Sequence, residues 1–317
     1  MRLAGQTARG KAFEYACLQV LFDSLRNNQN ITIEDTAAVS IARECYLRTP
    51  ESVVKKMELA AQAAVSAILR LEPQFEHPHD NTPLFLSIQA DMSGETGDVR
   101  DVLCVRKQNE WEIGFSCKHD HFAVKHSRLS NTIDFGSRWF SKPCSNLYFI
   151  EIAPLFAELR SLKAQGALWQ ELNNKEFRFY APLLRAFVSE LNRLDALYPD
   201  EIPPALITYL LGRNDFYKII ARNSTRTTEI QAFNLFGSLN RISGEVRPLF
   251  RIPQVKLPSR IFDVRFKENS SNTIIVTCDH GWAVSLRIHN ASSIVEPSLK
   301  FDVTFPSLQK TGLRGSK

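Results

Sequence analysis

Two pairs of polar residues, Asp98 with Asp101 and Ser116 with Lys118, stand at the ends of two apolar runs near the middle of the chain. Residues 99–106 and 110–118 have the composition of strands, and the polar stretch 107–110 is typical of a hairpin. If the strands pair antiparallel, the start of the first lies beside the end of the second, and Asp101 meets Ser116 and Lys118. Glu112 shares their face but lies about 20 Å further along the strand, so we do not expect it to be a ligand in the same site.

A carboxylate and a lysine at the ends of neighbouring strands are suited to the hydrolysis of a phosphodiester. A divalent cation held by carboxylates neutralises the charge of the transition state, and a nearby lysine orients the attacking water. A rigid sheet holds such groups in place. We therefore expect Asp101 to be a metal ligand, Lys118 to be catalytic and Ser116 to place a water. Asp98 is a second candidate metal ligand, although it could simply cap the turn after Gly97.

The composition is that of a globular protein with one large domain or two, since 44% of the 317 residues are hydrophobic. No apolar run is long enough for a membrane span, and the polar N-terminus lacks the apolar core of a signal peptide, so we expect a cytoplasmic protein. The six cysteines are scattered without a C-x-x-C pair. We expect reduced core thiols, because a zinc site needs paired spacings.

The net charge of +5 is modest, but it is unevenly distributed. Residues 203–317 hold 16 Lys and Arg against 8 Asp and Glu, whereas residues 1–202 hold 23 against 26. The excess fits a lobe that faces nucleic acid, or an uneven solvated surface. We predict a helical segment with a nuclease core in 1–202 and a β-rich, basic DNA-recognition lobe in 203–317.

The periodicity predicts an α+β fold. Helices are expected at 7–26, 34–47, 50–71 with Pro50 as the first helical residue, 145–163 and 179–197. Besides the central pair, strands are expected at 84–90, 249–252, 261–266, 273–277, 282–288 and 299–305. Residues 279–281 are typical of a hairpin turn, and 199–204 of a junction. Residues 120–130 could form a helix, or a loop that leads into one.

A dense polar cluster follows Lys118. Its members Lys125, His126 and Arg128 could contact phosphates and bases beside the scissile bond. The alternatives are a helix surface or an internal network that holds the site.

An Asp at the head of one strand, followed by an acid or Ser, any residue and Lys at the end of the next, resembles the PD-(D/E)xK nuclease superfamily. This chain has Ser116 where an acid usually stands. Members of the superfamily sometimes offset this with a Glu from a preceding helix, and Glu14 fits that role. Glu14 is therefore a third candidate metal ligand, although a Glu near a helix start also serves the helix dipole.

Longer strings resemble the HaeIII-type restriction endonucleases. They are KAFEYA at 11–16, GDVRDVL at 97–103, EIGFSCK at 112–118, AVKHSRLS at 123–130, DFG at 134–136 and YLLGRNDFYK at 209–218. The resemblance implies a nuclease core with a mixed sheet flanked by helices. It also implies a type II endonuclease that recognises GGCC in duplex DNA, cuts between G and C to leave blunt ends, and uses Mg²⁺.

Recognition of GGCC would need arginine or lysine side chains that bind guanine. Candidates in the basic last third include Arg222, Arg226 and Arg241, and further Arg247, Arg251, Arg260, Arg265 and Arg287. Asp263 and Asp302 could accept a hydrogen bond from cytosine, or they could form salt bridges. A palindromic site favours a homodimer over a monomer that nicks each strand in turn. A cognate DNA methyltransferase would belong to the same system without binding this protein.

Two other functions stay open at this point. One is a structure-specific repair or junction-resolving nuclease with the same core, which reads DNA shape rather than bases. The other is a non-catalytic DNA-binding protein in which Asp101 and Lys118 form an ordinary ion pair.

Overall fold

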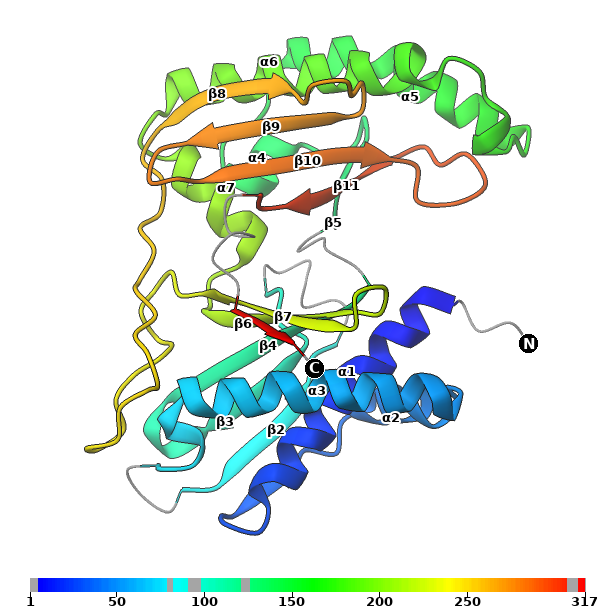
Figure 1. Ribbon diagram of the computed structural model, residues 1–317. Helices are drawn as coiled ribbons and strands as arrows, with labels where there is room; N and C mark the ends of the chain where they lie inside the picture. Colours follow the sequence, from blue (N-terminus) through cyan, green and yellow to red (C-terminus); the bar gives the residue numbers. More distant parts are fainter. Residues whose placement is uncertain (1–4, 79–81, 91–97, 121–125, 307–312, 317) are drawn as a thin grey trace. The chain divides into compact units, whose positions relative to one another are not determined.

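The computed structural model describes residues 5–78, 82–90, 98–120, 126–306 and 313–316. The chain divides into two compact units, each of which brings together distant parts of the sequence (Figure 1). The first unit consists of Met1–Phe122, Arg213–Val255 and Thr311–Lys317, and the second of Ala123–Gly212 and Lys256–Lys310. Residues 203–317, predicted as one recognition lobe, thus contribute to both units, and the functional division stays a prediction.

The first unit contains a mixed sheet. Its described strands, in spatial order, are β1 (Ile31–Ile33), β2 (Leu84–Ile88), β3 (Val102–Arg106), β4 (Trp111–His119), β6 (Phe216–Arg222), β7 (Thr227–Phe233) and β12 (Leu313–Ser316). The pairs β1–β2 and β4–β6 are parallel, and the others are antiparallel. The predicted hairpin of the two central strands is confirmed, with a short 3₁₀ turn at Lys107–Asn109 between them.

Three helices pack on this sheet: α1 (Gly5–Leu25), α2 (Ala37–Leu47) and α3 (Glu51–Leu71). All three were predicted, but Pro50 precedes the first turn of α3 as its N-cap instead of beginning the helix. Small buried residues on α1 and α3, such as Ala16, Ala61 and Ala64, let these two helices approach closely.

Alternation along the central strands separates an apolar face from a polar one. Ile113, Phe115 and Cys117 of β4 join the same hydrophobic core as residues of α1 and α3. Because successive side chains of a strand point to opposite faces, Ser116 and Lys118 belong to the other face. The core therefore fixes the direction in which the candidate catalytic side chains point.

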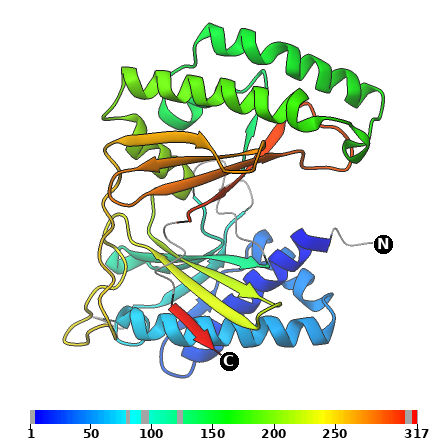
Figure 2. The same cartoon turned by 45° about the horizontal axis from the view of Figure 1, so that its top comes forward.

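The second unit contains an antiparallel sheet. In spatial order, its strands are β5 (His126–Leu129), β11 (Leu299–Thr304), β10 (Ala283–His289), β9 (Thr273–Cys278) and β8 (Ile261–Phe266). Its helices are α4 (Phe135–Phe140), α5 (Asn146–Ala164), α6 (Ala181–Leu197) and α7 (Ile202–Leu211), with a π-helical turn at Glu176–Tyr180 before α6. Figure 2 shows α5 and α6 on one side of this sheet.

An aromatic cluster joins helices and sheet in the second unit. Phe301 of β11 contacts Trp139 of α4 and Phe187 of α6, with ring centroids 6.1 and 5.2 Å apart. Trp139 also stacks on Tyr209 of α7 at 4.8 Å. The predicted turn between β9 and β10 is confirmed, and both His280 and Gly281 have positive φ, 52° and 79°, as a tight hairpin requires.

The structure corrects several sequence-based predictions. Residues 126–129 form β5 instead of a helix or a loop, and 249–252 form no strand. Pro203 and Pro204, predicted at a junction, lie in the first turn of α7, where the missing N–H needs no partner. Strands β6 and β7 were not predicted. In the described ranges, no helix is long and apolar enough to cross a membrane.

Candidate active site

Asp101 lies at the end of β3 that faces the end of β4, one residue beyond the registered pair Val102–Phe115. Its Oδ2 atom accepts hydrogen bonds from Lys118 Nζ at 2.9 Å, from the Cys117 amide at 2.6 Å and from Ser116 Oγ at 3.4 Å. The predicted meeting of Asp101 with Ser116 and Lys118 is thus confirmed as geometry. The hairpin alone brings these three residues together.

Lys118 is held as a cation. Burial by itself would lower the pKa of its amine, but the charge and hydrogen bond of Asp101 and the charge of Glu14 outweigh burial and raise the pKa. Its side chain keeps 20% of its surface exposed. Lys118 can therefore present positive charge to an anion that approaches the site.

Helix α1 brings Glu14 to the same place, because α1 packs directly on β4. Glu14 is buried, with 7% of its surface exposed, and it accepts a hydrogen bond from Lys11 Nζ at 3.1 Å. Burial and then the charge of Asp101 raise the pKa of Glu14 to about 7, while Lys11 and Lys118 act in the opposite direction. Glu14 and Asp101 are therefore close enough to repel each other when both are ionised.

Asp101 and Glu14 suit a hard divalent cation. In the described part of the chain, the hydrogen bonds to the Asp101 carboxylate all use Oδ2, which leaves Oδ1 for another ligand. Within these residues no cluster of three or more His, Cys, Asp or Glu could hold a metal by itself. Two carboxylates fit Mg²⁺, which keeps several waters and takes one or two carboxylates.

Both carboxylate oxygens of Asp98, by contrast, accept hydrogen bonds from Arg100. The guanidinium donates to Asp98 Oδ1 at 2.9 Å and to Oδ2 at 2.6 Å, and it forms an ion pair with Glu112 at 2.6 Å. Burial would raise the pKa of Asp98, but Arg100 outweighs burial and lowers it. Arg100 crosses the strand at Gly114, where a Cβ atom would lie 2.5 Å from the Arg100 Cδ. This arrangement anchors the segment before Asp101 and favours Glu14 over Asp98 as second ligand.

The structure adds Lys218, which the sequence did not single out, to the candidate site. It lies on β6 directly opposite Ser116, and only 3% of its surface is exposed. Burial and then the charge of Lys118 lower the pKa of Lys218 to about 7. The only signal in the sequence was a lysine inside an apolar run, at the end of the string 209–218.

The predicted DNA-binding residues are divided between the two units. Arg222, Arg226 and Arg241 belong to the first unit, where Arg222 pairs with Glu229 and Arg241 donates to the Gly237 carbonyl at 2.8 Å. Arg128 belongs to the second unit, where it is exposed on β5.

Of the other two predicted DNA contacts, His126 begins β5, and Lys125 lies outside the described residues.

His119 and Asp120, which follow Lys118, have a structural partner in Asn223. Its side-chain amide lies 3.0 Å from His119 Nε2 and donates to Asp120 Oδ2 at 2.7 Å, and its backbone amide donates to Asp120 Oδ1 at 2.8 Å. These contacts tie the end of β4 to the end of β6. They account for the polarity of the two residues without a metal.

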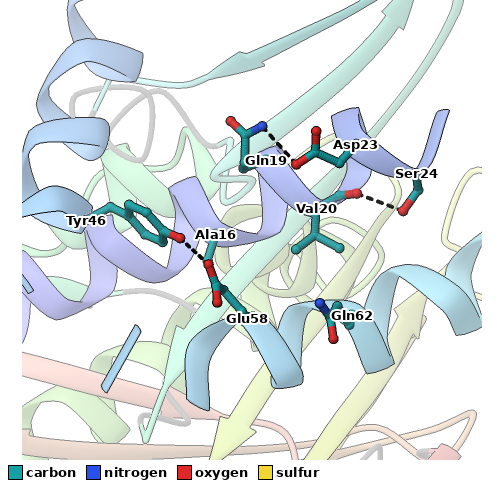
Figure 3. A pocket seen from close by; sticks show the side chains of 8 residues that line it. All are labelled: Ala16, Gln19, Val20, Asp23, Ser24, Tyr46, Glu58 and Gln62. Atoms are coloured by element: carbon teal, nitrogen blue, oxygen red, sulfur yellow. Dashed lines mark hydrogen bonds between the residues drawn. The ribbon is translucent and has the colours of Figure 1, made fainter. Parts of the chain in front are cut away.

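A separate hollow of about 350 Å³ lies between α1, α2 and α3 (Figure 3). Its walls include Gln19 and Asp23, which hydrogen-bond each other at 3.0 Å, and Tyr46, which donates to Glu58. These four polar side chains thus have partners within the helices. None of the candidate catalytic residues lines it.

The chain is similar to known proteins over nearly its whole length. A family model described as HaeIII restriction endonuclease matches residues 10–308. The type II restriction enzyme HaeIII of Haemophilus aegyptius is 44% identical over 294 residues, which cover 93% of this chain and 92% of that protein. No solved structure matches the chain.

Proposed function

The chain belongs to the HaeIII restriction endonuclease family and is by homology a type II restriction enzyme, and we propose that it cuts duplex DNA at GGCC, between G and C, with Mg²⁺ as cofactor. The resemblance of the strings around Glu14, Asp101 and Lys118 to HaeIII-type enzymes supports this specificity. The palindrome favours a homodimer as the active form, because a two-fold axis then relates two equivalent sites.

The proposal rests on one arrangement. Asp101 Oδ2 accepts hydrogen bonds from Lys118 Nζ at 2.9 Å and from the Cys117 amide at 2.6 Å, and it lies beside the buried carboxylate of Glu14. Asp101 and Glu14 would hold the divalent cation. When bound, the cation neutralises charge on the phosphate and lowers the pKa of a bound water.

The remaining steps belong to the protein's own side chains. Asp101 orients the Lys118 ammonium, which places a positive charge beside the reacting phosphate and stabilises the charge that develops there. Ser116 is completely buried next to Asp101 and positions a water through its hydroxyl. Arg100 holds the backbone before Asp101 through Asp98 and Glu112 and touches no reacting atom.

The test is to incubate the protein with plasmid DNA and Mg²⁺ and to sequence the ends of the products. We expect blunt ends at GGCC, no cleavage in EDTA, and no cleavage by Asp101→Asn, which keeps the size of the side chain but removes its charge. Cleavage at another sequence would disprove the specificity alone. Cleavage that persists in Asp101→Asn would disprove the site.

A further inference from the structure

The antiparallel sheet of the second unit has two unlike faces. Phe301, Val303 and Leu286 are buried on the face that meets the helices. The side chains between them in sequence belong to the opposite face, because successive residues of a strand alternate. The strand register puts seven of them on three neighbouring strands: Arg128 of β5, Lys300, Asp302 and Thr304 of β11, and Ser285, Arg287 and His289 of β10. We refer to these seven residues as the polar sheet face.

One row of the polar sheet face places two cations directly opposite each other. Lys300 is registered with Arg128 on one side and with His289 on the other. Like charges opposite each other on neighbouring strands destabilise a sheet. Burial lowers the pKa of Lys300, and of the two neighbouring charges Asp302 raises this pKa more than Arg128 lowers it. An anion bound between Arg128 and Lys300 would offset this repulsion.

The next row offers both donors and acceptors. Arg287 is exposed and registered with Asp302, whose Oδ1 lies 3.3 Å from His289 Nε2. Beyond them, the hydroxyls of Ser285 and Thr304 face each other. None of the seven residues is a large apolar side chain, unlike the core of a protein–protein interface, which is depleted in charge. Closely spaced cations beside hydrogen-bonding groups suit a polyanion with polar edges, which is the chemistry of duplex DNA.

We propose that the polar sheet face binds the substrate DNA, with one backbone phosphate held between Arg128 and Lys300. This proposal rests on the proposed function, and it adds a surface in the second unit to the catalytic residues of the first. Arg287 and Asp302 lie next to the held phosphate, where they can reach base edges. Of the two cations that hold the phosphate, Lys300 is the one that the sequence did not single out.

The test compares Lys300→Gln and Arg128→Gln with Arg185→Gln, which removes the same charge from an exposed position on α6. Binding to a short duplex that contains GGCC is measured in EDTA by fluorescence anisotropy over a range of salt concentrations. Loss of one phosphate contact should weaken binding about fivefold at about 0.15 M salt and reduce the slope of log K against log salt by about 1. Arg185→Gln should bind like the wild type, and Lys300→Arg should restore binding.

Two further measurements separate a contact from a structural role. Lys300→Gln should weaken binding to a duplex without GGCC by the same factor, because a phosphate contact carries no sequence information. The free energy of unfolding of Lys300→Gln should equal or exceed that of the wild type, because burial and Arg128 together disfavour the Lys300 charge more than Asp302 favours it. Wild-type affinity and salt slope in Lys300→Gln would overturn the proposed surface and leave the cleavage activity standing. A wild-type protein that neither binds nor cuts the GGCC duplex would overturn both.

Discussion

Replacing Glu14 by Gln should make the metal-free protein more stable while it abolishes cleavage. Burial and the charge of Asp101 raise the pKa of Glu14 from 4.5 to about 7. The folded state therefore binds more protons than the unfolded state between these two values, so the free energy of unfolding falls as pH rises through that window. At about 1.4 kcal/mol per pKa unit, ionised Glu14 costs the fold about 3 kcal/mol above about pH 7. The neutral amide of the variant would not carry this cost.

The measurement is chemical denaturation in EDTA at about pH 4.5 and about pH 8. Glu14→Gln should exceed the wild type by up to about 3 kcal/mol at the higher pH and show little advantage at the lower one. Glu190 provides a matched control of opposite sign. It is 4% exposed, and although burial opposes this, hydrogen bonds from Arg193 and Ser145 lower its pKa. Glu190→Gln should therefore lose stability at about pH 8, where the ionised wild-type side chain is favoured.

Cleavage of GGCC plasmid in Mg²⁺ completes this test. Loss of a direct metal ligand should reduce the cleavage rate by more than about 100-fold. A loss of about 100-fold is the upper end for residues that only support a metal ligand without binding the metal. If Glu14→Gln is less stable than the wild type at about pH 8, the electrostatic reasoning is refuted. If it cuts at the wild-type rate, Glu14 does not belong to the site and Asp98 becomes the candidate second ligand.

Three other changes test the role of Lys118 and the packing within each unit. Lys118→Met should keep duplex binding in EDTA within about tenfold but reduce single-turnover cleavage by at least about 100-fold, because the lost charge acts on the transition state; equal losses in both would contradict this. Gly114→Ala should lower the free energy of unfolding by about 1–3 kcal/mol, because the added Cβ would lie 2.5 Å from the Arg100 Cδ and would displace that side chain. Chemical denaturation measures this change, and an unchanged midpoint would exclude the close contact between residue 114 and Arg100. Phe301→Ala should cost about 3–5 kcal/mol by removing the ring that the sheet contributes to the aromatic cluster. A loss below about 1 kcal/mol would show that this ring contributes little.

The sequence alone was sufficient for the hairpin that carries Asp101, Ser116 and Lys118. A short polar connection between two apolar runs makes the strands neighbours, and the two-residue period then places these side chains on one face. Helices α1, α2, α3, α5 and α6 were also predictable, since their apolar stripes repeat within one segment, whereas the shorter helices α4 and α7 were not predicted. Both patterns depend on residues that are near one another in the chain.

Local patterns failed where distant segments decide the structure. Leu249–Ile252 has the composition of a strand, but the Leu249 amide donates to the Arg70 carbonyl, and the side chain of Leu249 is 56% exposed. Strand β6 was missed, although it lies in the middle of the sheet, because its parallel pairing with β4 joins segments about a hundred residues apart.

The complete candidate site depends on such long-range packing. Helix α1 brings Glu14 beside Asp101, and β6 places Lys218 opposite Ser116. The pairing of β5 with β11 sets Arg128 against Lys300 in the second unit. The types of these residues are written in the sequence, but the register between strands that are distant in the chain is set by the burial of their apolar faces. A shift of one residue in its strand would turn Lys218, Arg128 or Lys300 to the opposite side of its sheet.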